Sequence, residues 1–202
     1  MITRPNNWNE VKEFSDRKKL EINAAVAKVR QAVTKSSEYG EQLCILFEIA
    51  EGDYAGFYQE DFNNQIPETG KEKKWKGVLR IFLPKNDGSE KDEWAKSTLK
   101  GMTTAFEKSN PGYQWNWDEK SLANKLVGIL YRDEEWDYQG KTGWAKRPFR
   151  AISVDSVRDG SFTVPKAKAL QRENAYADNH SDTSAFGSMP PVVEDEDDQL
   201  PF

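Results

Sequence analysis

The apolar residues of this chain fall in short runs bounded by turn-forming residues. The clearest run, residues 42–50, is rich in β-branched and aromatic side chains and ends at a glycine-containing turn, which is typical of a β-strand. Similar runs lie at residues 77–83 and 125–131, and residues 56–62 alternate loosely enough to pair back on the first run. Residues 24–34 fit either a helix, because of their alanines, or a bulged strand. The pattern predicts a mainly β fold.

One segment between these runs has helical spacing instead. Ser89 with Asp92 indicates a helix start, and the Ser-Asn-Pro-Gly sequence at 109–112 indicates a stop. We expect a helix of about 16 residues there. A long hairpin follows, with strands at 126–138 and 144–157 and a glycine-rich tip. The apolar residues of the expected helix recur at helical intervals, at Ala95, Leu99, Met102 and Phe106.

The expected order of elements is strands, one helix and then a hairpin. A five-stranded barrel with one helix between its third and fourth strands has this order, which is that of OB-folds, whose loops between strands 1–2 and 4–5 bind oligonucleotides. We therefore expect an OB-fold-like domain over residues 21–168. An irregular lead-in over residues 1–20 precedes it. Residues 169–202 have too few large apolar side chains to offset the entropy of ordering, which predicts a disordered acidic tail.

The charge of the chain is unevenly distributed, and this changes the meaning of its net charge of −5. Residues 171–202 hold eight acids and one base, which leaves 28 bases and 26 acids in residues 1–170. A mildly basic body is compatible with a nucleic-acid partner. No stretch approaches the ~18 consecutive apolar residues of a membrane span. The first residues lack a basic and apolar leader, so we expect a cytoplasmic protein.

Catalytic and metal sites are poorly supported. One cysteine, Cys44, and one histidine, His180, do not make a Cys/His zinc site, and Cys44 lies in an apolar run typical of a core. Gly140-Lys141-Thr142 lacks the earlier glycine of a phosphate-binding loop. The acids at 133–135 and 137 suggest a metal-dependent nuclease as an alternative, but consecutive strand residues alternate between faces. We predict a non-enzymatic protein without metal or cofactor.

Aromatic and basic residues are interleaved in two places, which is the composition of a surface for single-stranded nucleic acid. There, cations follow the phosphates and exposed rings stack on bases. The first cluster surrounds Trp75, and the second lies on the predicted hairpin. The predicted DNA-binding residues are Lys74, Trp75, Lys76, Trp136, Tyr138, Lys141, Trp144, Lys146, Arg147, Phe149 and Arg150.

Core packing is the alternative interpretation of these aromatic residues. Tryptophan and phenylalanine are mainly core residues, and a lysine beside them often lays its aliphatic stem along the ring. On an uninterrupted strand, Trp144, Lys146 and Arg150 share one face, and Arg147 and Phe149 share the other. A surface of this kind also suits a protein partner, so an adaptor without direct DNA binding is the second hypothesis.

The C-terminus combines acids with a small apolar group, in the sequence Asp-Asp-Gln-Leu-Pro-Phe at 197–202. This tip resembles that of bacterial single-stranded DNA-binding proteins, apart from the intervening Gln199. The resemblance implies a peptide that recruits replication and recombination proteins. Acids pair with partner cations while the terminal ring fills an apolar pocket. The predicted partner-docking residues are Asp197, Asp198, Leu200, Pro201 and Phe202.

The body also resembles a known group, the phage-encoded OB-fold proteins of replication modules in phages that infect Gram-positive bacteria. Residues 46–54, 107–113 and 153–160 carry the similarity, which with their spacing covers about residues 8–168. The resemblance implies sequence-tolerant single-stranded DNA binding in phage replication or recombination, in the cytoplasm of the host. It gives no DNA-contact residues for this body, and a homo-oligomer stays possible.

Overall fold

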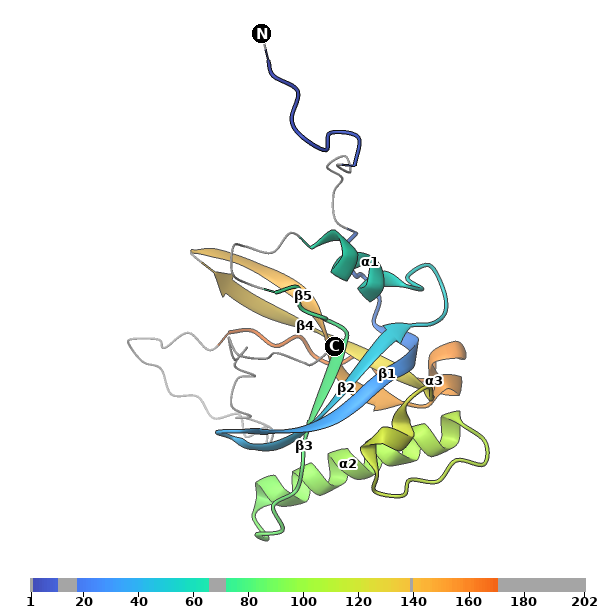
Figure 1. Cartoon of the computed structure of the whole chain (residues 1–202). Helices are drawn as coiled ribbons and strands as arrows, with labels where there is room; N and C mark the ends of the chain where they lie inside the picture. Colours follow the sequence, from blue (N-terminus) through green and yellow to red (C-terminus); the bar gives the residue numbers. More distant parts are fainter. Residues whose placement is uncertain (1, 11–17, 66–71, 139, 171–202) are drawn as a thin grey trace, which may run out of the picture.

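A computed structural model describes residues 2–10, 18–65, 72–138 and 140–170 (Figure 1). The described chain contains a five-stranded antiparallel sheet of order β3-β2-β1-β4-β5, which confirms the prediction of a mainly β fold with five strands. The elements are β1 (Ala24–Ser37), β2 (Gly40–Ile49), α1 (Phe57–Asn64), β3 (Val78–Phe82), α2 (Glu90–Ser109), the short 3₁₀ helix η1 (Glu119–Leu122), β4 (Leu126–Tyr138), β5 (Lys141–Ile152) and α3 (Val154–Arg158).

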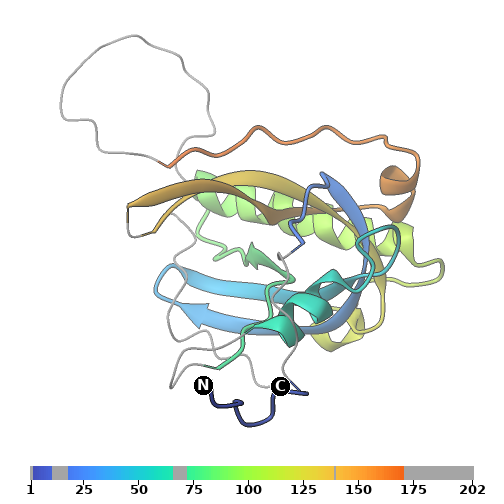
Figure 2. The same ribbon diagram turned by 90° about the horizontal axis from the view of Figure 1, so that it is seen from above.

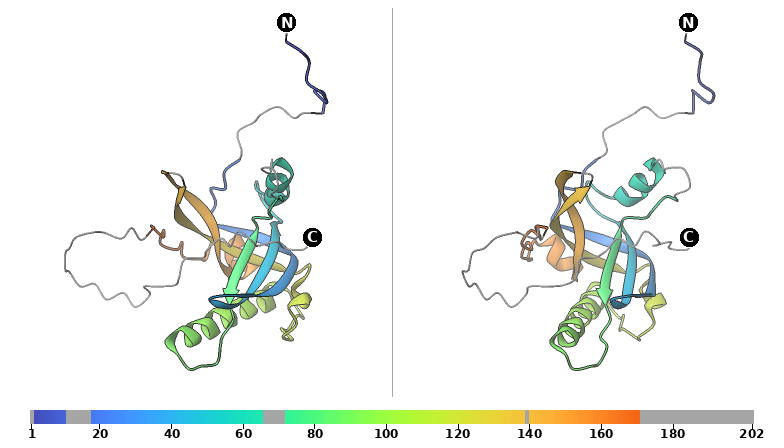
Figure 3. Two further views of the ribbon diagram at one scale, coloured as in Figure 1. Left: turned by 60° about the vertical axis from the view of Figure 1, so that its left-hand side comes forward. Right: turned by 90° about the vertical axis from the view of Figure 1, so that its left-hand side faces the viewer.

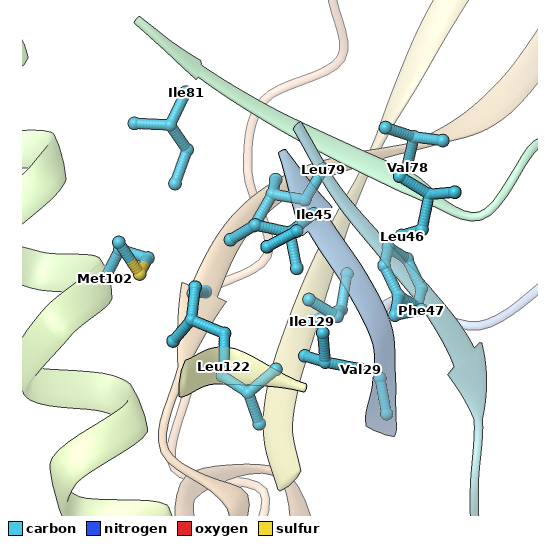
Figure 4. Close-up of a cluster of buried hydrophobic side chains, with 14 of the residues drawn as sticks. Val29, Ile45, Leu46, Phe47, Val78, Leu79, Ile81, Met102, Leu122 and Ile129 are labelled. Carbon is cyan, nitrogen blue, oxygen red and sulfur yellow. The ribbon is translucent and has the colours of Figure 1, made fainter. Parts of the chain in front are cut away.

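The sheet curves around one apolar core (Figure 2). Its inner face contributes the buried side chains of Val29, Ile45 and Ile129, and Met102 of α2 and Leu122 of η1 reach the same cluster from outside the sheet (Figure 4). The two ends of the strand order, β3 and β5, are not paired with each other in the described sheet. The described sheet is therefore open, with β3 and β5 at its two edges.

Helix α2 confirms the prediction made from Ser89 and the apolar spacing. The Ser89 hydroxyl accepts the backbone N–H of Asp92 at 3.2 Å and caps the helix. The Asp92 carboxylate is buried, accepts the N–H groups of Asn86 and Gly88, and pairs with Lys96 at 2.9 Å. These contacts, above all that with Lys96, hold the pKa of Asp92 below its usual value. The predicted stripe is buried, at Ala95, Leu99, Met102 and Phe106.

The segment 56–62, expected to pair back on the first strand, instead provides the N-cap and the first six residues of α1. Gly56 adopts a left-handed φ of 78°, which turns the chain out of the sheet. The carboxylate of Glu48, on β2, accepts the N–H groups of Tyr58 and Gln59 at 3.0 and 2.7 Å. Tyr58 is buried, with its ring edge-on to Phe47. The helix thus depends on a residue outside its own segment, which local patterning does not reveal.

The structure also decides between the two predictions for residues 24–34 and moves the end of the last strand. Residues 24–34 belong to strand β1, which contains a bulge between Val29 and Gln31. Strand β5 ends at Ile152 rather than at 157, because the Ser153 hydroxyl accepts the N–H of Ser156 and starts α3. None of the described helices has the length and apolar character that a membrane crossing requires.

Candidate nucleic-acid interface

The outer half of the β4–β5 hairpin projects beyond the rest of the sheet (Figure 3). Pairing of β1 with β4 ends at Ala24 and Leu130, whereas β4 and β5 stay paired out to Tyr138 and Lys141. The predicted long hairpin is thus present, and its tip carries Gly140 at a left-handed φ of 74°. In this outer half, neither β4 nor β5 pairs with a third strand of the five-stranded sheet. Side chains project from both faces of this two-stranded ribbon.

A bulge at Phe149 decides which hairpin residues share a face. Leu130 pairs with Arg150 and Tyr131 with Pro148, which leaves Phe149 as an extra residue on β5. Cross-strand partners lie on the same face, and consecutive β4 residues lie on opposite faces. Arg150 therefore lies on the face opposite to Pro148. The prediction that Arg150 shares a face with Trp144 and Lys146 is wrong, because it assumed uninterrupted alternation.

We call the resulting basic surface the outer face of the hairpin. Arg132 and Arg147 are direct cross-strand partners on it, and Trp136 pairs with Gly143. Among the described hairpin residues, this face holds four bases and one acid, Glu134. Its members are Arg132, Glu134, Trp136, Tyr138, Lys141, Gly143, Ala145, Arg147, Phe149 and Arg150.

Two aromatic residues of the outer face, Trp136 and Tyr138, are exposed. Trp136 is 39% exposed and Tyr138 is 65% exposed. The Trp136 ring lies so close to its partner Gly143 that a Cβ atom on that glycine would meet ring carbons at 2.6 and 2.8 Å. Trp136 thus lies against the backbone of Gly143 and keeps part of its surface accessible to solvent. This is the arrangement that base stacking requires.

Cations surround the ring of Phe149. The Arg132 guanidinium lies 4.4 Å from the ring centroid and that of Arg150 lies 5.3 Å away. Arg132 also donates to the Glu134 carboxylate, which fixes its orientation. Such guanidinium–ring contacts align planar cations for phosphate oxygens. Arg132 is absent from the sequence-predicted site, although its even spacing from Trp136 along one strand would have placed the two on a common face.

The opposite, inner face is acidic. Asp133, Glu135 and Asp137 lie there, with Trp144 opposite Glu135. Lys146 is also on this face, but its ammonium group donates to Asn23 and Asp133, each at 2.8 Å, and its side chain is only 13% exposed. Lys146 therefore lies on the face opposite to the one that carries Arg132, Arg147 and Arg150. Its contacts hold the hairpin base to the residue that precedes β1.

The base of the hairpin is also tied to α1. The Tyr58 hydroxyl donates to the Tyr131 hydroxyl at 3.3 Å in the buried interior. Burial raises the pKa of both phenols above the usual value, so both are neutral at physiological pH. The hairpin therefore leaves the sheet from a fixed base.

The predicted cluster around Trp75 lies beside α1 rather than on the hairpin. Trp75 is 7% exposed and its indole N–H donates to the carbonyl oxygen of Phe47 at 3.1 Å. The Arg30 guanidinium covers the ring, 4.2 Å from its centroid. The Trp75 ring is therefore buried between β2 and the Arg30 side chain and does not lie on the outer face of the hairpin. Lys76 pairs with Asp61 at 3.1 Å, while Lys74 is exposed.

The predicted docking residues at 197–202 lie outside the described residues. Among the hairpin residues predicted from sequence, the structure brings together Trp136, Tyr138, Lys141, Arg147, Phe149 and Arg150 on one face. It adds Arg132 and removes Trp144 and Lys146 to the other face. In comparisons with known proteins, no protein-family model and no curated protein matches this chain.

Proposed function

We propose that this chain binds single-stranded DNA through the outer face of the hairpin, without catalysis and without strong sequence preference. The observation that carries the proposal is the gathering of exposed rings and arginines on one face of a projecting ribbon, with the acids largely on the other. Arginines neutralise phosphates, while Trp136 and Tyr138 stack on bases. Because every base has a π-face, such stacking tolerates any sequence and contributes about 1–3 kcal/mol per base.

The single strand is favoured over the duplex by the same geometry. A base is free to stack on Trp136 or Tyr138 only when it is not already stacked and paired within a helix. The hairpin also lacks the uniform basic character of a duplex groove binder, since its inner face holds Asp133, Glu135 and Asp137. The cations of the outer face and the rings beside them suit single-stranded DNA, because its flexible backbone can turn the bases toward the protein.

The strand order supports an OB-fold for the body. β1 pairs with β2 and β4, β3 lies at the far side of β2, and α2 lies between β3 and β4, as in OB-folds. In Figure 1 the β1–β2 turn and the outer end of the hairpin both extend toward the left of the view, with the hairpin higher and the turn lower. We propose a barrel of this type, encoded by a phage and acting in replication or recombination in the host cytoplasm. The C-terminal tip would recruit the partner enzymes.

The test is an anisotropy titration of labelled oligo(dT), a single-stranded RNA of equal length and the matching duplex, each at two salt concentrations. We expect tight binding of oligo(dT), much weaker binding of the duplex, and a log–log salt slope of ~0.7 per phosphate neutralised. An affinity for oligo(dT) that does not change with salt concentration, or an absence of binding to all three probes, would contradict the proposal. Absence of binding favours the adaptor hypothesis.

A fluorescence experiment locates the binding surface. Oligo(dT) should quench the tryptophan emission of the wild type, and the Trp136→Phe variant should lose part of that quenching. Trp117→Phe is the matched control, because Trp117 is 77% exposed but lies in the loop before η1 rather than on the hairpin. Equal loss in both variants would remove the hairpin from the proposal while leaving DNA binding itself intact.

A further inference from the structure

The last described segment, residues 166–170, runs along the edge of β4, and we call it the strap. Lys168 forms a parallel bridge with Glu134. Its N–H donates to the carbonyl oxygen of Asp133 at 2.8 Å, and its own carbonyl accepts the N–H of Glu135 at 2.9 Å. The Leu170 N–H adds a bond of 3.1 Å to the Glu135 carboxylate. Figure 2 shows this segment returning from α3 along the hairpin.

The strap occupies an edge that β1 leaves open. Asn23, just before β1, accepts the N–H of Tyr131, and beyond that point β1 no longer accompanies β4. The strap takes over at Asp133 and Glu135, so these backbone groups are paired rather than left as an open strand edge. Around Glu134, the strap therefore lies beside the projecting hairpin as a third backbone segment, in the order β5, β4, strap.

The bridge also fixes the face on which Lys168 lies. Bridge partners share a face, so Lys168 lies beside Glu134 on the outer face. In an extended chain, Lys166 lies on the same side, two residues away. The strap thus adds Lys168 to the outer face, next to the single acid found there among the described hairpin residues, and Lys166 is exposed two residues earlier. Positive charge therefore extends beyond β4 on that face, and Glu134 lies between the cations Arg132 and Lys168.

We propose that the strap is the third segment of the protein surface that binds single-stranded DNA, with Lys166 and Lys168 contacting the phosphate backbone. The inference rests on the proposed function and adds to it residues outside the hairpin. The strap also keeps the hairpin edge closed, so that the arginines and rings of the outer face hold a constant orientation.

The charge contribution is tested in the full chain with the double variant Lys166→Ala/Lys168→Ala. It leaves the backbone pairing in place, and we expect weaker oligo(dT) binding with a salt slope lowered by up to ~1.4, for two phosphate contacts. The matched control is Lys91→Ala/Lys108→Ala, which removes the same charge from exposed positions on α2. The control should keep the wild-type salt slope.

The backbone contribution is tested with Lys168→Pro, read against Lys168→Ala. Proline removes the N–H that Asp133 accepts, so we expect a further loss of oligo(dT) affinity beyond the alanine variant. Ala169→Pro is the control, because in an extended chain its N–H points away from β4. If the wild type binds oligo(dT) and both strap variants bind as well as it does, the strap plays no part and the proposed function stands. If the wild type does not bind, the proposed function itself fails.

Discussion

Trp136 lies against the backbone of Gly143, its cross-strand partner, so closely that a Cβ atom at residue 143 would lie 2.6 Å from the indole Cζ2. A side chain at residue 143 would collide with the rigid ring, so glycine at this position allows the indole to lie against the backbone. Gly143 has no left-handed backbone that would require glycine for its own sake. The pairing makes residue 143 part of the proposed binding surface, although it has no side chain to offer a ligand.

The first prediction concerns this pair. Gly143→Ala displaces the Trp136 ring from the hairpin, and we expect reduced quenching by oligo(dT) and weaker binding in the titration. The loss is bounded by the ~1–3 kcal/mol of one stacked base. Gly101→Ala on α2 is the control, because a Cβ built there meets nothing within 4 Å outside the surrounding helix backbone. Equal binding by both variants would mean that the position of the indole is immaterial.

The two faces of the hairpin predict opposite results for their cations. Replacing Arg132, Arg147 and Arg150 by alanine should lower the salt slope of oligo(dT) binding by up to ~2, for three phosphate contacts. Lys146→Met should leave the slope unchanged. It should instead lower the free energy of unfolding by about 1 kcal/mol, a modest value because water reaches the Asp133 carboxylate. Urea unfolding and the titration together separate the effects, and a slope change in the Lys146 variant would contradict the face assignment.

The buried tyrosine pair predicts a stability loss at high pH. Burial raises the folded-state pKa of Tyr58 and Tyr131 above the value of about 10 in the unfolded chain. Their contribution is therefore fully present below pH ~10 and is lost as pH rises from there through the folded pKa. The slope should approach ~1.4 kcal/mol per pH unit for each tyrosine.

Urea unfolding between about pH 9 and 11.5 measures this loss. The double variant Tyr58→Phe/Tyr131→Phe should show a shallower decline of the unfolding free energy than the wild type. Tyr39→Phe is the control, because Tyr39 lies exposed in the β1–β2 turn. Parallel pH profiles for the wild type and the double variant would contradict the assignment of the loss to this pair.

The acidic tip predicts a separation of DNA binding from recruitment. Deleting residues 194–202 removes the acids and the terminal apolar group together. We expect oligo(dT) binding to be equal or tighter, because an anionic competitor for the basic outer face is lost. Capture of replication or recombination enzymes by the immobilised protein should disappear. Weaker DNA binding by the shortened chain would argue against competition by the tail.

Sequence patterning predicts the elements whose determinants are local. Helix α2 follows from the Ser89 cap and from apolar residues three or four positions apart, and both lie within one segment. The hairpin arms follow from composition and the glycine-rich tip. Helix α1 does not, because Glu48 on a different element completes its first turn.

The composition of the candidate site is only partly predictable for the same reason. Its aromatic and basic residues are visible in the sequence, but their faces depend on one extra residue, Phe149, whose bulge is set by pairing with β4. Burial of Trp75 depends on a carbonyl of β2 and on the Arg30 guanidinium of β1. Lys146 and Asn23 are more than a hundred residues apart and meet only after the sheet is formed.

The contact between Glu48 and α1 has a consequence for the order of folding. A helix of eight residues is too short to be stable alone, and its N-cap residue, Gly56, has no side chain that could accept the first N–H groups. The acceptor for its first N–H groups comes from β2, so the helix gains its start only once that strand is in place. We therefore expect α1 to form after the β1–β2 pair and to open first under denaturing stress. Its amide protons would then exchange earlier than those of the strands it covers.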